Sequence, residues 1–157
     1  MGELGKRDEI VRQATVRDLH EVIDDHARYW GERDLRSLHV CALVHEFPET
    51  SLVAVGDDGI RGYILGFVTP ARVAYAHLIA TRDDTRGTGL GRRLYTAFAT
   101  AASQQGAVQL KAITSPTNEG SISFHRSLDF EARLIEDYDG PGQPRMVFTR
   151  DLSQPLS

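Results

Sequence analysis

Cysteine is almost absent from this chain of 157 residues, in which Cys41 stands alone. A lone cysteine excludes an internal disulfide framework and a multi-cysteine zinc site, and it is typical of a reducing compartment. Long apolar runs are missing too, because no stretch approaches the roughly 18 residues needed to cross a bilayer. The first residues, MGELGKRDEIVRQ, contain no apolar segment of the kind found in a secretory signal. We therefore expect a cytoplasmic location and no membrane partner.

The chain also lacks an excess of basic residues. It has 18 Lys and Arg against 22 Asp and Glu, a formal net charge of −4, whereas surfaces that bind nucleic acid are usually basic. Internal repeats and low-complexity tracts are missing as well, and 41% hydrophobic residues suffice for one core. The sequence therefore predicts a single domain over residues 1–157, with an ordered core of about 9–152, and no nucleic-acid partner.

What is present is an alternation of strand-like and helix-like segments. Apolar residues recur at helical spacing after Asp18, which stands at an expected helix cap, and again from Leu35 to about Pro48. The order of strand, two helices, three strands, helix, strand, helix and two strands predicts a mixed α/β fold with a βαβ crossover. The expected strands are Ile10–Ala14, Ser51–Val55, Gly62–Val68, Val73–Thr81, Val108–Thr114, Phe130–Tyr138 and Met146–Leu152, and the later helices are Leu90–Ala101, ending near Gly106, and Asn118–Leu128.

A glycine-rich turn joins the fourth expected strand to the long helix. Its residues Thr85–Leu94 read TRGTGLGRRL, with glycines at every second position from Gly87 to Gly91. Glycines allow backbone N–H groups to converge on an anion, and the helix N-terminus adds partial positive charge. The spacing fits neither a Walker loop nor a dinucleotide fingerprint. Taken alone, the glycines do not decide between a pyrophosphate site and a tight turn without a ligand.

The segment Arg86-Gly87-Thr88-Gly89-Leu90-Gly91 resembles the signature Arg/Gln-x-x-Gly-x-Gly/Ala of the GNAT acetyltransferase superfamily. A second segment, Asn118-x-x-Ser121-x-x-Phe124-His125 followed by Phe130, resembles another motif of that family, and the resemblance covers nearly the whole chain. It implies a mixed sheet of about six or seven strands with helices on both faces. It also implies that the sheet is splayed in the middle, between Val73–Thr81 and Val108–Thr114.

The resemblance further implies acetyl-CoA as co-substrate and no metal. The backbone of the glycine turn is then expected to wrap the pyrophosphate, and the strand end at Thr81 to pair with the pantetheine arm, which Asn118 helps to hold. The residues expected to bind the cofactor are Ile79, Ala80, Thr81, Arg86, Gly87, Thr88, Gly89, Leu90, Gly91, Arg92 and Asn118.

Two positions depart from the family pattern, since His125 stands where a tyrosine is frequent and Asp129 where a glycine is. In the family that tyrosine often protonates the departing thiolate. His125 is a candidate for the same work as an imidazolium, because an imidazole of pKa near 6.5 is a competent acid. The alternative is a histidine that only packs beside Phe124.

The candidate general base is His77, nine residues before Arg86 on the strand that enters the glycine turn. A family member has a catalytic histidine at the matching position. With a period of two, Tyr75, His77, Ile79 and Thr81 are expected to share one face, where Tyr75 is a candidate for fixing a water molecule. The alternative is a histidine that merely hydrogen-bonds within a half-buried strand.

Tyr29, Trp30 and Arg33 surround the break between the first two helices, which borders the acceptor site in this family. Aromatic and guanidinium groups there are candidates for binding the substrate. The alternative is a solvated basic loop in which Trp30 closes the core. Cys41 and His45 are four residues apart, but the sequence offers no third metal ligand beside them, so core packing is the interpretation.

The sequence therefore predicts an acetyl-CoA-dependent N-acetyltransferase that transfers an acetyl group directly to a primary amine of a small molecule. Two alternatives stay open: a non-catalytic acyl-CoA-binding or sensor module on the same fold, and an enzyme that acetylates protein N-termini or lysines. A homodimer is left open as the oligomeric state.

Overall fold

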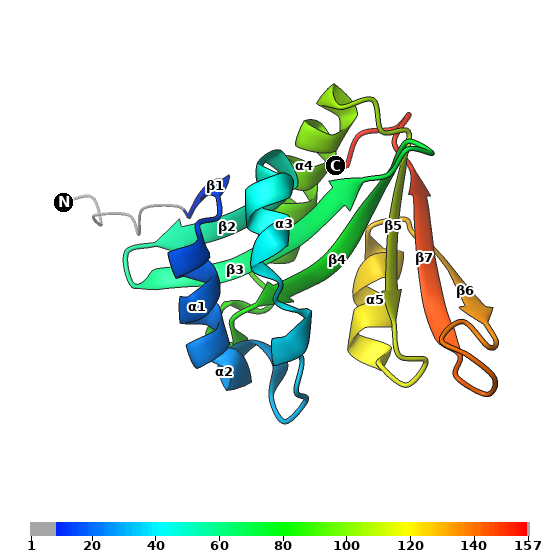
Figure 1. Cartoon of the computed structure of the whole chain (residues 1–157), viewed down its shortest axis with the longest axis horizontal. Helices are drawn as coiled ribbons and strands as arrows, with labels where there is room; N and C mark the ends of the chain where they lie inside the picture. The colour runs from blue at the N-terminus through cyan, green and yellow to red at the C-terminus, as the bar shows by residue number, and fades with distance from the viewer. Residues whose placement is uncertain (1–8, 157) are drawn as a thin grey trace.

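The computed structural model describes residues 9–156 and shows one seven-stranded sheet in the order β1-β2-β3-β4-β5-β7-β6 (Figure 1). The seven strands and the helices on both faces confirm the predicted fold class. The strands are β1 (Ile10–Gln13), β2 (Ser51–Gly56), β3 (Gly59–Val68), β4 (Val73–Thr81), β5 (Gln109–Thr114), β6 (Glu131–Ile135) and β7 (Arg145–Asp151), and the α-helices are α1 (Val16–Asp24), α2 (His26–Trp30), α3 (Cys41–Glu46), α4 (Leu90–Gln104) and α5 (Glu119–Ser127).

The sheet is split between β4 and β5, as predicted. These parallel neighbours pair only from Val73 opposite Gln109 to Ala76 opposite Ala112. Beyond Ala76 the two strands diverge, and α5 lies beside the widening gap in Figure 1. The edge of β4 from residue 77 to 81 therefore has no paired residue on β5, and its backbone polar groups on that side are open to a ligand.

A β-bulge interrupts β4 at the split. Leu78 lies opposite Leu65 of β3, but the next pair joins Ala76 to Gly66, so His77 has no partner residue. An extra residue shifts the alternation of the two faces by one position. The prediction that Tyr75, His77, Ile79 and Thr81 share one face is therefore wrong, because Ile79 packs in the core beside α4, whereas the Tyr75 ring lies 5.5 Å from Phe67 on the other face.

Two cores sandwich the sheet. In Figure 1, α1, α2 and α3 lie over one face and α4 over the other. The larger core is centred on α4, whose Leu94, Tyr95 and Phe98 are completely buried against the sheet. The smaller core joins α1–α3 to the opposite face through residues such as Leu19 and Tyr63. Within residues 9–156, no helix has both the length and the apolar character to cross a membrane.

The N-terminal helices differ from the predicted ones. Thr15, not Asp18, is the N-cap of α1, while Asp18 is the third helical residue and accepts from the Thr15 backbone N–H in a capping box. The second predicted helix, from Leu35 to about Pro48, is instead a 3₁₀ turn at Arg36–Leu38 followed by the shorter α3, whereas α2 precedes it as a separate helix. Apolar spacing alone could not reveal this division, since side chains from elsewhere in the chain hold the segment between α2 and α3, as described below. Near the C-terminus, β6 ends at Ile135 rather than Tyr138.

Candidate active site

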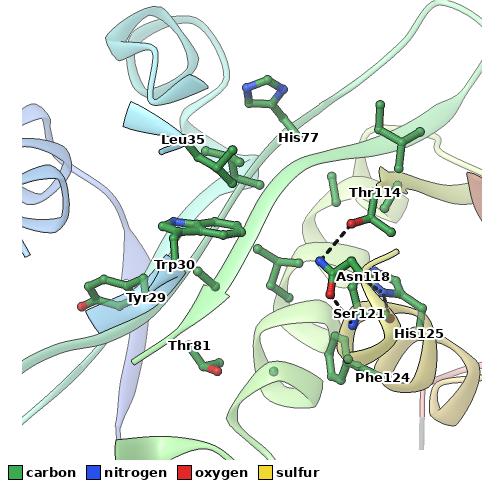
Figure 2. A pocket seen from close by; sticks show the side chains of 18 of the residues that line it. Tyr29, Trp30, Leu35, His77, Thr81, Thr114, Asn118, Ser121, Phe124 and His125 are labelled. Atoms are coloured by element: carbon green, nitrogen blue, oxygen red, sulfur yellow. Dashed lines mark hydrogen bonds between the residues drawn. The ribbon is translucent and has the colours of Figure 1, made fainter. Parts of the chain in front are cut away.

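A cleft of about 1070 Å³ opens where β4 and β5 separate. Two groups of residues face each other across it, and Figure 2 shows Trp30, Leu35 and His77 on one side and Asn118, Ser121 and His125 on the other. We call residues 85–92 and 114–128 the cofactor wall and residues 29–38 the acceptor wall, after the roles that the sequence predicts for them. The charged residues that line the cleft are Arg33, Arg86, Arg92, Arg145 and Asp139, so the cleft is electropositive and suits an anionic ligand.

The glycine turn of the cofactor wall has the backbone shape that an anion site needs. Gly87 and Gly89 have φ of 80° and 83°, in the left-handed region that favours glycine. Gly89 is the N-cap of α4 and supplies no side chain to cap the first backbone N–H groups of this 15-residue helix. Those donors and the helix dipole meet at the cleft, so the turn fits the pyrophosphate of acetyl-CoA.

Gly91 has a different reason to be glycine. A Cβ atom on Gly91 would lie 2.8 Å from Cζ of Phe124, so the missing side chain allows α4 and α5 to pack closely. Arg86 reaches across the cleft, where its guanidinium donates to the Tyr29 carbonyl at 3.2 Å. It thereby links the glycine turn to the acceptor wall.

Asn118 organises the start of α5. Its side-chain oxygen accepts from the Ser121 backbone N–H and its amide group donates to the Thr114 hydroxyl, both at 3.1 Å (Figure 2). Asn118 is thus the helix N-cap, and it also lines the cleft as the sequence analysis expects of a cofactor-binding residue.

His125 is 2% exposed and both of its ring nitrogens are occupied. Its Nδ1–H donates to the Ser121 carbonyl at 2.8 Å, so Nε2 accepts from the Tyr95 hydroxyl at 2.7 Å. Its ring also stacks on Phe148 at 4.1 Å. Burial lowers the pKa of His125 to about 4, so the ring is neutral near pH 7. This geometry favours a structural role over the imidazolium acid that the sequence analysis considers, and a catalytic role for His125 stays an untested prediction.

His77 lies at the β4 bulge and lines the cleft. Its Nε2 is 2.8 Å from the Leu38 carbonyl oxygen. A carbonyl can only accept, so Nε2 carries the proton in the neutral ring and Nδ1 keeps its lone pair. The contact fixes the tautomer and orientation of the imidazole, the arrangement by which a histidine base is usually held.

Tyr75 lies beside His77, with 6.4 Å between the ring centroids. Burial raises the pKa of Tyr75 to about 12, and nearby Tyr138 and Asp139 add to the rise, so its hydroxyl stays protonated at neutral pH. Asp139 itself pairs with Arg145 at 2.7 Å. Both members of this ion pair line the cleft, and the sequence offered no signal for Arg145, which lies between the last two predicted strands.

Tyr29, Trp30 and Arg33 all line the cleft, as expected. Tyr29 is largely a core residue, since its hydroxyl donates to the Ile60 carbonyl at 2.9 Å and it is only 4% exposed. The Trp30 indole N–H donates to the Tyr63 hydroxyl at 2.7 Å. Leu35 and Leu38 complete this wall, and no motif in the sequence points to them.

The Acetyltransferase (GNAT) family model matches residues 16–130 of this sequence. The chain belongs to the GNAT acetyltransferase family. Two curated relatives of this GNAT chain are L-2,4-diaminobutyric acid acetyltransferases, one from Marinococcus halophilus at 26% identity over 68% of the chain and one from Halomonas elongata at 28% over 69%. The chain spans 66% and 55% of the lengths of these two relatives.

Solved structures share the fold at low sequence identity. Ard1 from Thermoplasma volcanium superposes with a TM-score of 0.76 at 19% identity, covering 92% of this chain and 97% of that protein. A phosphinothricin acetyltransferase from Sinorhizobium meliloti in complex with acetyl-CoA gives a TM-score of 0.68 at 17% identity, covering 96% of this chain and 94% of that one. These likenesses confirm the GNAT fold of the split sheet.

Proposed function

We propose that this GNAT protein is an acetyl-CoA-dependent N-acetyltransferase that acetylates a primary amine of a small molecule by direct transfer. The observation that carries the proposal is the split of the sheet beyond Ala76, which opens the edge of β4 beside the glycine turn at the N-terminus of α4. Membership of the family and the names of the curated relatives support an acetyl-transfer reaction.

Acetyl-CoA, when bound, supplies an activated acetyl thioester. The residues that would hold it are the backbone N–H groups of the glycine turn, with Arg86 and Arg92 adding positive charge at the cleft. The free edge of β4 from residue 77 to 81 would pair with an extended amide-bearing arm as an added strand does. Asn118, already fixed by its two hydrogen bonds, would present its amide group from the opposite side.

His77 is the proposed general base. An alkyl ammonium has a pKa near 10, so at neutral pH it must lose a proton before its nitrogen can attack. Nδ1 of His77 has the lone pair to accept that proton, because Nε2 donates to Leu38. The same carbonyl then stabilises the imidazolium that forms. Tyr75, protonated and adjacent, is the proposed holder of a water molecule between base and amine.

The acceptor amine is proposed to carry an acidic group. Among the charged residues that line the cleft, Asp139 is neutralised by Arg145, whereas the Arg33 guanidinium lies 6.0 Å from the Trp30 ring with no carboxylate of residues 9–156 paired to it. The remaining positive charge favours a carboxylate and disfavours a polycation. The named substrates of the two curated relatives, which are amino acids, support this choice.

Thiol release from acetyl-CoA tests the proposal with a matched pair of amines. 2,4-Diaminobutyrate and its decarboxylated counterpart, 1,3-diaminopropane, differ only in the acid group. We expect kcat/KM to be about tenfold higher for the amino acid, and Arg33→Gln to remove most of that preference. Arg17→Gln, at an exposed arginine on α1 outside the cleft lining, is the matched control. Equal rates for the two amines would overturn the choice of acceptor.

A wider panel of amines tests whether the protein catalyses acetyl transfer at all. It adds a peptide with a free N-terminus, a peptide with an internal lysine and an aminoglycoside. Binding of acetyl-CoA without turnover of any amine would support the non-catalytic sensor instead. Turnover of the peptides alone would support a protein acetyltransferase.

A further inference from the structure

Three histidines hold the backbone of one short segment of the acceptor wall. His26 of α2 accepts from the Leu35 N–H through Nε2 at 3.0 Å, and His39 donates from Nδ1 to the Leu35 carbonyl at 2.8 Å. His77 of β4 donates to the Leu38 carbonyl at 2.8 Å. We call these three residues the histidine clamp. His26 and His77 reach the segment from other elements, His39 directly follows it, and His26 and His39 bind the same residue.

The protonation pattern around His39 has one consistent solution. The Leu35 carbonyl only accepts, so Nδ1 of His39 carries a proton and Nε2 of the neutral ring must accept. The Tyr63 hydroxyl lies 2.7 Å from that Nε2 and donates to it. The Tyr63 oxygen in turn accepts the Trp30 indole N–H at 2.7 Å. All donors run in one direction, from Trp30 through Tyr63 and His39 to the segment.

Two residues of the clamp, His26 and His39, lie in the interior of the protein. His26 and His39 are 3% and 6% exposed, and their rings lie 5.8 Å apart. The titratable groups that face His39 are His26 from α2, Tyr63 from β3 and His77 from β4. A proton added to Nε2 of His39 would place a charge in this buried site and leave the Tyr63 hydroxyl proton without its acceptor. The hydrogen-bond network that runs from Trp30 through Tyr63 and His39 to the segment therefore requires neutral His39.

The segment held by the clamp has little support of its own. Its only regular structure is the single 3₁₀ turn Arg36–Leu38, which has no side-chain cap. Leu35 and Leu38 nevertheless line the cleft, and Figure 2 shows Leu35 on the same side as Trp30. The shape of the acceptor wall thus depends on contacts made from other elements.

We propose that His26, His39 and His77 act together as positioning residues that fix residues 35–38 as one wall of the acceptor site, and that protonation of His39 releases this wall. The proposal rests on the proposed function only in calling the wall acceptor-binding. The clamp itself is open to measurement without any turnover.

Hydrogen exchange of the Leu35 amide, read by NMR at constant pH, tests the first contact. His26→Phe keeps a ring but removes the acceptor, and we expect exchange about five- to tenfold faster, the loss of one hydrogen bond. His26→Gln, whose side-chain oxygen can accept in place of Nε2, is expected to restore most of the protection. The matched control is His45→Phe, an exposed histidine on α3. Unchanged exchange in a folded His26→Phe protein overturns the clamp.

Trp30 is the one tryptophan of the chain, so its fluorescence reports the other end of the network. His39→Phe and Tyr63→Phe are each expected to shift its emission, while His45→Phe leaves it unchanged. For the amine acceptor we expect His39→Phe to raise KM several-fold with a smaller effect on kcat and none on the KM for acetyl-CoA. An emission spectrum that neither variant alters would overturn the network.

If the phenylalanine variants do not fold, a pH titration of the wild-type protein tests whether protonation releases the wall. Lowering the pH from about 8 to 5 is expected to change Trp30 emission reversibly while far-UV circular dichroism stays constant, with Leu35 exchanging faster than its intrinsic pH dependence predicts. Flat emission together with purely intrinsic exchange would overturn release of the wall by protonation.

Discussion

The two walls of the cleft are built in different ways. The cofactor wall is shaped by its own local sequence: glycines in the left-handed region, an uncapped helix start and the Asn118 cap of α5. The acceptor wall has little regular structure and is held by His26 of α2, His77 of β4 and the adjoining His39, which Tyr63 of β3 contacts from behind. A main-chain site suits a ligand that every member of a family shares, whereas a wall held by side chains can change shape with single substitutions.

The largest effect is expected from His77→Ala, which removes the proposed base from the acceptor side. We expect kcat to fall about 10²- to 10⁴-fold, with partial recovery at high pH, where more free amine is present. Affinity for acetyl-CoA, measured by calorimetry, is expected to stay near the wild-type value, because the cofactor is proposed to contact the strand backbone. A near-normal kcat in a protein that melts like the wild type would make His77 a structural residue.

The pH dependence of the free energy of unfolding tests the buried, neutral state of His125 in the cofactor wall. The folded pKa of His125 is about 4, below the ordinary value near 6.5, so the unfolded chain binds a proton between these values that the folded chain does not. Stability is therefore full above about pH 6.5 and falls as the pH drops towards 4, by about 2 to 3 kcal/mol for this group. Urea unfolding at several pH values measures it. The folded His125→Asn protein is expected to have a flatter profile than the wild type, while His20→Asn, an exposed histidine on α1, keeps the wild-type slope.

Gly89→Val tests whether the cofactor wall depends on main-chain shape. A β-branched residue at a φ of 83° is strained by about 1 to 3 kcal/mol, and its side chain would stand where the phosphate is proposed to approach the start of α4. We expect coenzyme A to bind about tenfold more weakly or worse in calorimetry. Gly142→Val imposes similar strain at a φ of 71° in the β6–β7 turn, away from the cleft lining. Equal losses of affinity in both variants would indicate general destabilisation and would contradict a pyrophosphate site in the glycine turn.

The smallest effect is expected from Arg86→Ala. The side chain is exposed, so solvent and salt screen its charge, and we expect coenzyme A affinity to fall only a few-fold. The loss is expected to shrink as ionic strength rises, in the same calorimetric assay. An effect larger than that of Gly89→Val would reverse the view that backbone donors dominate this wall.

Local sequence determined much of this protein. The glycine spacing predicted the turn at the start of α4, and the hydrophobic pattern predicted the succession of strands along the chain. The two family-like segments predicted the split sheet that the structure shows. These features depend on residues close together in the chain, where backbone preferences and helix caps act directly. The missed cap at Thr15 was a local error of three positions within the same capping box.

Tertiary structure decided the rest. The bulge at His77 comes from the register between β3 and β4, and a period-two reading of one strand cannot reveal it. The neutral state of His125 results from burial among Tyr95 and Phe148, which are distant in sequence. Likewise, the division of the second predicted helix and the place of Leu35 in the cleft depend on His26 of α2 and His77 of β4. Hydrogen bonds between distant residues act through space and leave no period in the sequence.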